Sequence, residues 1–85
     1  MKDSDILLTN LSELHTTKLG EKRIIKNLNL QNADAVAYCK SRISDDNCNI
    51  NKRGKNYYCE TDDLIITVNS YNYTIITAHR TSAGI

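Results

Sequence analysis

The first part of the chain spaces its apolar residues as an α-helix does. Three leucines recur at i, i+4 and i+7, at Leu7, Leu11 and Leu14. We expect Ser4 to cap the helix that carries them. A second apolar stripe contains Ile24 and Leu28, and the hydroxyl residues Thr16 and Thr17 before it predict a second helix with one of them as its cap. The pattern therefore begins with two helices.

A third helix is predicted from Ala33 to about Ile43, with Asn32 as its cap. From Cys48 onward the apolar period changes from helical to two, which is typical of strands. Four strands are predicted, over residues 48–52, 56–60, 63–69 and 73–80. Because short turns separate them, neighbouring strands should pair antiparallel.

These elements predict an α+β fold in which three N-terminal helices pack on one face of a four-stranded antiparallel β-meander. We expect one domain over residues 1–85, with a helical part (1–47), a sheet (48–80) and a flexible tail (81–85). A chain of this length has room for one modest core, so a second domain is excluded.

Turn lengths predict which side chains share a face of the sheet. We place two-residue turns at Arg53-Gly54 and Thr61-Asp62 and a three-residue loop at 70–72. One face is then apolar and buried, and it includes Thr74 and Ile76. The opposite face is mixed, and it carries Tyr58, Ile65, Thr67, Asn69, Tyr73, Ile75, Thr77 and His79. Such a face is either a binding surface or solvated sheet.

Composition narrows the classes of function. The chain has 11 lysine and arginine residues against 10 aspartate and glutamate residues, so net charge alone does not attract nucleic acid. It has no apolar run that would serve as a signal peptide or membrane helix, which predicts a cytoplasmic protein with no membrane partner. Cys39, Cys48 and Cys59 predict reduced thiols. No spacing predicts a metal site or a cofactor.

Cations nevertheless gather in two segments. Four lie in the second helix, at Lys18, Lys22, Arg23 and Lys26, and three at the first turn of the sheet, at Lys52, Arg53 and Lys55. With Tyr58 and Tyr73 as surfaces on which bases could stack, these cations predict an RNA-binding surface. The alternative is an ordinary solvated, charged face.

Two histidines, His15 and His79, are the side chains that an acid and base pair needs near neutral pH. The alternative is that His15 bonds to a helix terminus and His79 ends a strand in solvent. Whether the two imidazoles share a site depends on how residue 15 folds back on the sheet.

The chain resembles an uncharacterised bacterial family, domain-of-unknown-function family 3781, in residues 14–20, 23–24, 27–28, 53–56, 67–69 and 73–79. The family name implies no activity. The helices followed by a sheet that ends in Thr-Ile-Ile-Thr-Ala-His also resemble the barnase/EndoU/colicin/RelE group of metal-independent ribonucleases, many of them toxins. That likeness implies attack of a ribose 2′-hydroxyl on the adjacent phosphate, with candidate residues His15, Thr17, Arg23, Asn69, Thr77 and His79.

Two functions follow as expectations. The first is a metal-independent ribonuclease or toxin-like protein, with the two histidines as base and acid and Arg23 holding the phosphate. The second is a non-catalytic binding module, of a regulatory, antitoxin-like or anti-defence kind, that recognises RNA or protein through the open sheet face. The sequence does not decide the oligomeric state.

Overall fold

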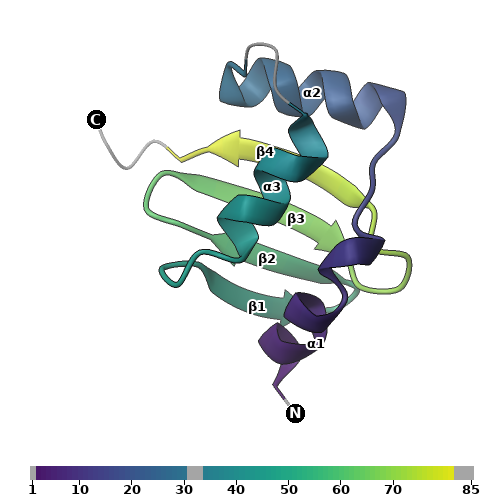
Figure 1. The fold of residues 1–85 in the computed structure, drawn as a ribbon, viewed down its shortest axis with the longest axis vertical. Helices are drawn as coiled ribbons and strands as arrows, with labels where there is room; N and C mark the ends of the chain where they lie inside the picture. The colour runs from purple at the N-terminus through teal and green to yellow at the C-terminus, as the bar shows by residue number, and fades with distance from the viewer. Residues whose placement is uncertain (1, 31–33, 82–85) are drawn as a thin grey trace.

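The computed structural model describes residues 2–30 and 34–81. The helical elements are α1 (Asp3–Thr9), a 3₁₀ turn η1 (Leu11–Glu13), α2 (Lys18–Leu28) and α3 (Ala35–Ile43). The strands are β1 (Asn49–Arg53), β2 (Asn56–Glu60), β3 (Leu64–Asn69) and β4 (Ile75–Arg80). They form one antiparallel sheet in the order β1-β2-β3-β4, with the helices on one side (Figure 1). The predicted α+β fold is confirmed.

The helix starts are set by local hydrogen bonds. The side chain of Thr17 accepts a hydrogen bond from the backbone N–H of Gly20 at 3.0 Å, which confirms a threonine as the cap of α2. In the described part of the chain Asp34 caps α3 in the same way, and its carboxylate accepts from the backbone N–H of Ala37 at 3.1 Å. Residues 31–33, on which the predicted cap Asn32 falls, lie outside the described residues, as does the predicted tail beyond Thr81.

The first helix differs from its prediction at both ends. It begins at Asp3 after Lys2 with no side-chain cap, so Ser4 lies inside the helix. It ends at Thr9, where the hydroxyl of Thr9 donates to the carbonyl of Asp5 and the amide of Asn10 donates to the carbonyl of Ile6. The side chain of Asn10 thus occupies the carbonyl of Ile6, one of the last four of the helix, where a further turn would place a backbone N–H. Leu11 and Leu14 therefore reach the core from a 3₁₀ turn and an extended residue.

The core lies between the helices and the sheet. It is built from side chains of every layer, and its largest fully buried members are Leu7, Ile24, Leu28, Ile43, Leu64, Ile66, Ile75 and Val68. The α2 helix lies along β4 (Figure 1). Two side chains join them: Asn27 donates to the carbonyl of Ala78 at 3.2 Å, and Arg80 donates to the carbonyl of Leu28 at 3.0 Å.

The first two turns lie one position from their predicted places. Gly54 and Lys55 form the two-residue turn that joins β1 to β2. Gly54 is suited to its place because it has φ +57°, and a type II′ hairpin turn needs a positive φ at its first central residue. A turn at Arg53-Gly54 would pair Ile50 with Tyr57, and a turn at Thr61-Asp62 would pair Cys59 with Leu64. In the structure Ile50 pairs with Cys59, and Cys59 pairs with Ile66. In both pairs of strands the register differs from the predicted one by two residues, so the side chains of β1, β2 and β3 keep their predicted faces.

The last hairpin corrects the predicted faces. Its loop has one residue more than predicted, because Tyr73 takes φ 59° and Asn69 closes the loop on Thr74. The register between β3 and β4 then shifts at Thr67/Val68. The extra residue turns Ile75 into the core, 1% exposed, and leaves Ile76 42% exposed. Tyr73, Thr74, Ile75 and Ile76 were thus assigned to the wrong faces, since a slip of one residue reverses a strand.

Asp63, in the turn before β3, forms hydrogen bonds to residues of two other elements. Its carboxylate accepts hydrogen bonds from Thr61 at 3.1 Å, Arg42 at 2.9 Å and Arg80 at 3.1 Å. The Thr61 hydroxyl is the largest cause that lowers the pKa of this carboxyl, and the two guanidinium groups lower it further. Asp63 therefore links α3, the β2–β3 turn and β4.

We expect Asp63→Asn to destabilise the protein at neutral pH and to do so progressively less in acid. A folded-state pKa below the unfolded value gives stability above the unfolded pKa, about 3.9, that is lost as pH falls through the folded pKa. Urea unfolding at pH 7 and pH 3 measures this. Asp62→Asn, with no side-chain bond among the described residues, is the matched control, and an equal effect of both variants would contradict the prediction.

Candidate functional site

The sheet face that turns away from the helices is the candidate site, and we call it the open face. Its pairings place Asn51, Tyr58, Thr67 and Thr77 side by side in one row across the four strands. A second row runs through Asn49, Glu60, Ile65 and His79. The first row consists of amide and hydroxyl side chains, whereas the second combines an amide, a carboxylate, an aliphatic side chain and an imidazole. Thr67 is only 7% exposed, so its neighbours cover the centre of the face.

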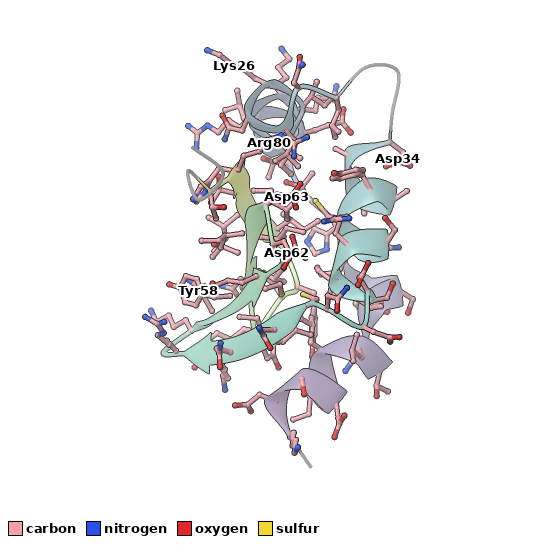
Figure 2. The ribbon with its side chains drawn as sticks, turned by 90° about the vertical axis from the view of Figure 1, so that its left-hand side faces the viewer. Lys26, Asp34, Tyr58, Asp62, Asp63 and Arg80 are labelled. Carbon is pink, nitrogen blue, oxygen red and sulfur yellow. The ribbon has the colours of Figure 1, made fainter. Side chains whose placement is uncertain are left out.

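Tyr58 is the aromatic centre of the open face. Figure 2 shows it pointing away from α3. The guanidinium carbon of Arg53 lies 5.6 Å from the centroid of its ring, a cation–π contact. The Gly54 turn brings the two together, because it pairs Arg53 with Asn56 and so places Tyr58 diagonally from Arg53. The pair offers a stacking surface with a positive charge at its edge.

Tyr58 is half-buried, and the end of the sheet at which Arg53 lies also carries an exposed aromatic ring. The backbone N–H of Ser70 donates to the carbonyl of Lys55 at 2.7 Å, which brings the β3–β4 loop against the β1–β2 turn. Tyr71, in that loop, is 75% exposed. The side chain of Asn69 accepts from the N–H groups of Tyr71 and Asn72 and holds the loop in shape. This end of the sheet therefore combines the exposed ring of Tyr71 with the cations of the β1–β2 turn.

Cations of α2 border the opposite edge of the open face. Helix geometry puts Arg23 on the stripe of Asn27, four residues later, whose amide reaches β4. Ile24 and Leu28 point into the core, and Arg23 and Lys26 are exposed on the remaining surface of the helix. Lys26 extends from the outer surface of α2 in Figure 2. Lys18 and Lys22 are also exposed on this helix.

The structure separates the two histidines. His15 forms a parallel bridge with Thr74, at the start of β4, while His79 pairs with Ile65 near its end. Five residues of strand between Thr74 and His79 span about 16 Å. His15 and His79 are therefore not brought together at one phosphate.

Both ring nitrogens of His15 have partners. Nδ1 lies 2.9 Å from the carbonyl oxygen of Glu13 and Nε2 lies 3.0 Å from the hydroxyl of Thr74. Because a carbonyl only accepts, Nδ1 donates to Glu13, and Nε2 shares the second hydrogen bond with the hydroxyl of Thr74. The backbone of His15 also bonds to Tyr73 and Ile75. His15 thus fastens the segment before α2 to the edge of β4.

The remaining predicted residues divide between the open face and other places. Thr77 is half-buried on the open face. The hydroxyl of Thr17 caps α2. Tyr73 packs against the core, so the structure does not offer it as a stacking surface. Lys52 points to the α1 side of β1. Of the predicted RNA-binding residues, Tyr58, Arg53 and Lys55 come together.

Two residues were missed: Asn51 on the open face and Tyr71 in the loop that lies against the β1–β2 turn. Asn51 pairs with Tyr58 and could have been found from strand alternation. Tyr71 lies in a loop whose contact with Lys55 joins distant segments, and no local pattern signals that contact.

The cysteines lie apart from this face. Burial raises the pKa of Cys39 to about 12, which keeps the thiol protonated. A hydrogen bond with Cys59 lowers the pKa of the half-buried Cys48, and the same bond raises the pKa of Cys59. All three thiols are free. Within the described residues, no group of three or more histidine, cysteine or acidic side chains forms a metal site.

The chain belongs to the family described as proteins of unknown function, DUF3781, whose sequence profile matches residues 8–79. No curated protein matches the chain, and no solved structure does. In residues 2–30 and 34–81, no helix has the length and apolar character needed to cross a membrane.

Proposed function

We propose that this protein binds single-stranded RNA on its open face as a non-catalytic binding module. The observation that carries the proposal is the Arg53–Tyr58 contact on the open face, where Tyr58 lies in a row with the amide of Asn51 and the hydroxyls of Thr67 and Thr77. Base stacking on an aromatic ring and a cation beside the ring are the two features that bind single-stranded nucleic acid without a fixed sequence. Arg53 and Lys55 at one border and Arg23 and Lys26 at another would attract the phosphates.

The amides and hydroxyls favour RNA over DNA. Asn51, Asn56 and Thr77 present donors and acceptors around Tyr58. Such groups can bond to a ribose 2′-hydroxyl, which DNA lacks. Charge is unevenly placed as well: the carboxylate of Glu60 is the one acidic group in the two described rows, and the carboxylate of Asp63 is bonded to two arginines.

RNA cleavage has less support from this geometry. It needs a base and an acid within hydrogen-bond reach of one phosphate. The bonds of His15 to Glu13 and Thr74, and the separation of His15 from His79, give no such arrangement. Cleavage by 2′-hydroxyl attack stays a prediction, which incubation of the protein with total RNA in the presence of a chelator tests.

Fluorescence anisotropy with short labelled oligoribonucleotides tests binding. We expect Tyr58→Ala to weaken binding about tenfold, because stacking of one base contributes roughly 1–3 kcal/mol. Tyr58→Phe should retain most of the affinity. Arg53→Gln should weaken binding and reduce its dependence on salt, whereas Lys40→Gln, on α3, removes an equal charge from the helix side and should not.

Three results would contradict the proposal. One is the absence of binding to any oligoribonucleotide at low salt. Another is an equal affinity for the matching DNA strands, which would leave no role for the 2′-hydroxyl. The third is an equal effect of Arg53→Gln and Lys40→Gln, which would place the bound strand elsewhere. Recovery of the intact oligonucleotide after binding separates binding from cleavage.

A further inference from the structure

The two edges of the sheet differ. Along β4, the backbone of His15 bonds to Tyr73 and Ile75, and the hydroxyl of Thr16 donates to the carbonyl of Ile75 at 2.9 Å. The α2 helix then follows the rest of that strand. At β1, by contrast, no strand of residues 2–30 or 34–81 pairs with the outer edge. An unpaired edge can accept another strand.

The hairpin geometry identifies the free backbone groups of β1. Residues that flank a two-residue turn exchange both of their backbone hydrogen bonds, so Arg53 bonds to Asn56 and, by alternation, Asn51 bonds to Tyr58. The N–H and C=O groups of Ile50 and Lys52, which lie between these bonded positions, point outward from the sheet. They are spaced as an added strand requires.

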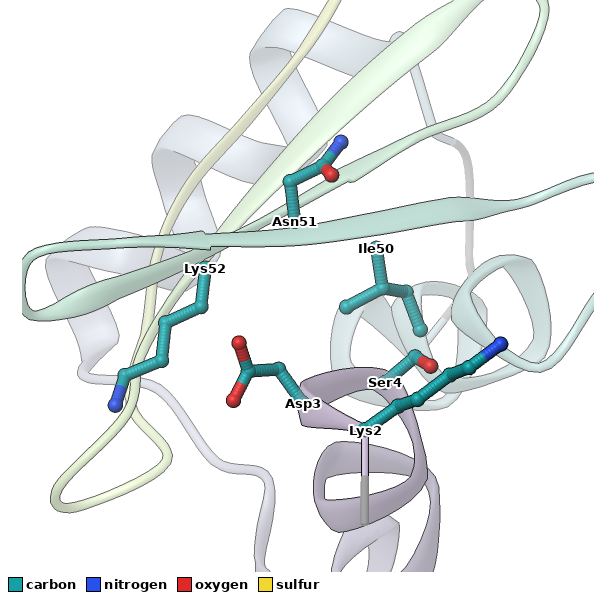
Figure 3. A pocket seen from close by; sticks show the side chains of 6 residues that line it. All are labelled: Lys2, Asp3, Ser4, Ile50, Asn51 and Lys52. Carbon is teal, nitrogen blue, oxygen red and sulfur yellow. The ribbon is translucent and has the colours of Figure 1, made fainter.

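The surroundings of this edge also suit a side chain of such a strand. An open depression of about 420 Å³ lies beside it, lined by Lys2, Asp3, Ser4, Ile50, Asn51 and Lys52. In Figure 3 the side chains of Ile50 and Lys52 point toward α1, whereas Asn51 points the other way. A side chain of an added strand would therefore enter the depression next to Ile50.

The charged side chains around the outer edge of β1 indicate which kind of added strand would bind there. Lys2 and Lys52 line the depression, with Asp3 as its one acidic group, and Arg53 and Lys55 lie at the end of β1. The ion pairs among the described residues involve Asp63 and not these cations. A second copy of β1 would bring a like set of cations to the edge, which resists self-pairing. A strand that carries carboxylates would meet opposite charge.

We propose that the outer edge of β1 binds an extended acidic peptide segment of a partner protein as a fifth strand of the sheet. Backbone bonds to Ile50 and Lys52 give the affinity, and the cations select acidic side chains. This proposal does not depend on RNA binding, because the backbone groups concerned lie at the edge of the sheet.

The test is a titration of the isotope-labelled protein, without RNA, by a capped peptide of alternating valine and glutamate. We expect the largest amide shifts in nuclear magnetic resonance spectra at Ile50 and Lys52, and smaller ones at Tyr58. The same peptide with glutamine for glutamate should bind about tenfold more weakly. Methylation of alternate peptide nitrogens, in the frame that faces β1, should abolish binding while methylation in the other frame should not.

A protein variant gives a second measurement. Lys52→Pro removes the outward N–H while leaving the bonds to β2, and proline is tolerated on edge strands, so we expect at least about tenfold weaker binding. Lys52→Gln keeps the N–H and should lose less. The methylated peptides need no variant, so a Lys52→Pro protein that fails to fold leaves the test intact.

Several results would overturn the proposal: no shifts at β1, equal binding of the acidic and glutamine peptides, or shifts confined to the open face. A dimer detected by sedimentation that Lys52→Gln strengthens and Lys52→Pro abolishes would assign the edge to a second copy instead.

Discussion

Replacing Ile75 with alanine is expected to lower the free energy of unfolding by about 3 kcal/mol, the middle of the range for truncating a buried isoleucine. Ile75 is 1% exposed and packs in the core on the helix side of β4. The extra loop residue Tyr73 turns it inward. Urea unfolding followed by circular dichroism measures the change.

The neighbouring residue is the matched control. Ile76 is 42% exposed, so Ile76→Ala removes the same atoms from a position that is already in contact with water. We expect it to cost less than about 1 kcal/mol. Equal losses at both positions, or a larger loss at Ile76, would show that β4 has the regular alternation that its sequence alone predicts and that the register shift is absent.

The second large effect is expected at Gly20, where α2 approaches the segment that binds β4. A Cβ atom at this position would collide with the hydroxyl oxygen of Thr16 and come within 3.2 Å of that of Thr17. To make room, Thr16 must rotate and give up its bond to the carbonyl of Ile75. We expect Gly20→Ala to destabilise the protein by about 2 kcal/mol, despite the better helix propensity of alanine.

A double-mutant cycle tests the cause. In a Thr16→Ala background the colliding hydroxyl is gone, and the Cβ of residue 16 lies at an ordinary 3.6 Å from the new methyl group. Gly20→Ala should then be neutral or stabilising by up to about 1 kcal/mol, because alanine favours the helix. A loss of similar size in both backgrounds would mean that Thr16 is not the obstacle. Thermal and urea unfolding of the four proteins give the cycle.

Strand alternation was enough to predict the faces of β1, β2 and β3. The turns were placed one position away, yet both registers slipped by two residues, which leaves Tyr58 on the open face and Tyr57 in the core. The family could also be predicted from short segments of the sequence, and all of these segments lie within residues 8–79, which the family profile matches.

The faces at the start of β4 could not be predicted by the same method. Tyr73 takes a positive φ, which glycine or asparagine normally supplies, so nothing local marks the extra loop residue. Ile75 and Ile76 are identical in chemistry, and only the register decides which one is buried. The pattern of apolar and polar residues is therefore equally consistent with either isoleucine on the buried face.

In the candidate site, too, the positions that depend on neighbouring residues could be predicted, and those that depend on contacts far along the chain could not. The place of Tyr58 follows from its own strand, whereas the position of His15 depends on Thr74, 59 residues away. A cap at Thr16 or Thr17 was correctly predicted, and Thr17 is the residue that supplies it, because capping needs only the residues that follow the cap. The proximity of Tyr71 to Lys55 depends on two loops that meet only after the sheet has formed.

The bonds that hold His15 and Thr16 against the edge of β4 also affect when the chain can fold during its synthesis. His15 and Thr16 are made early, but their partners Thr74 and Ile75 are among the last residues of the described chain to be made. Until then, Ile24 and Leu28 of α2 have no strand beside them. A ribosome-bound chain that ends before β4 should therefore remain sensitive to protease throughout, and protection should arise in one step once the final strand has emerged.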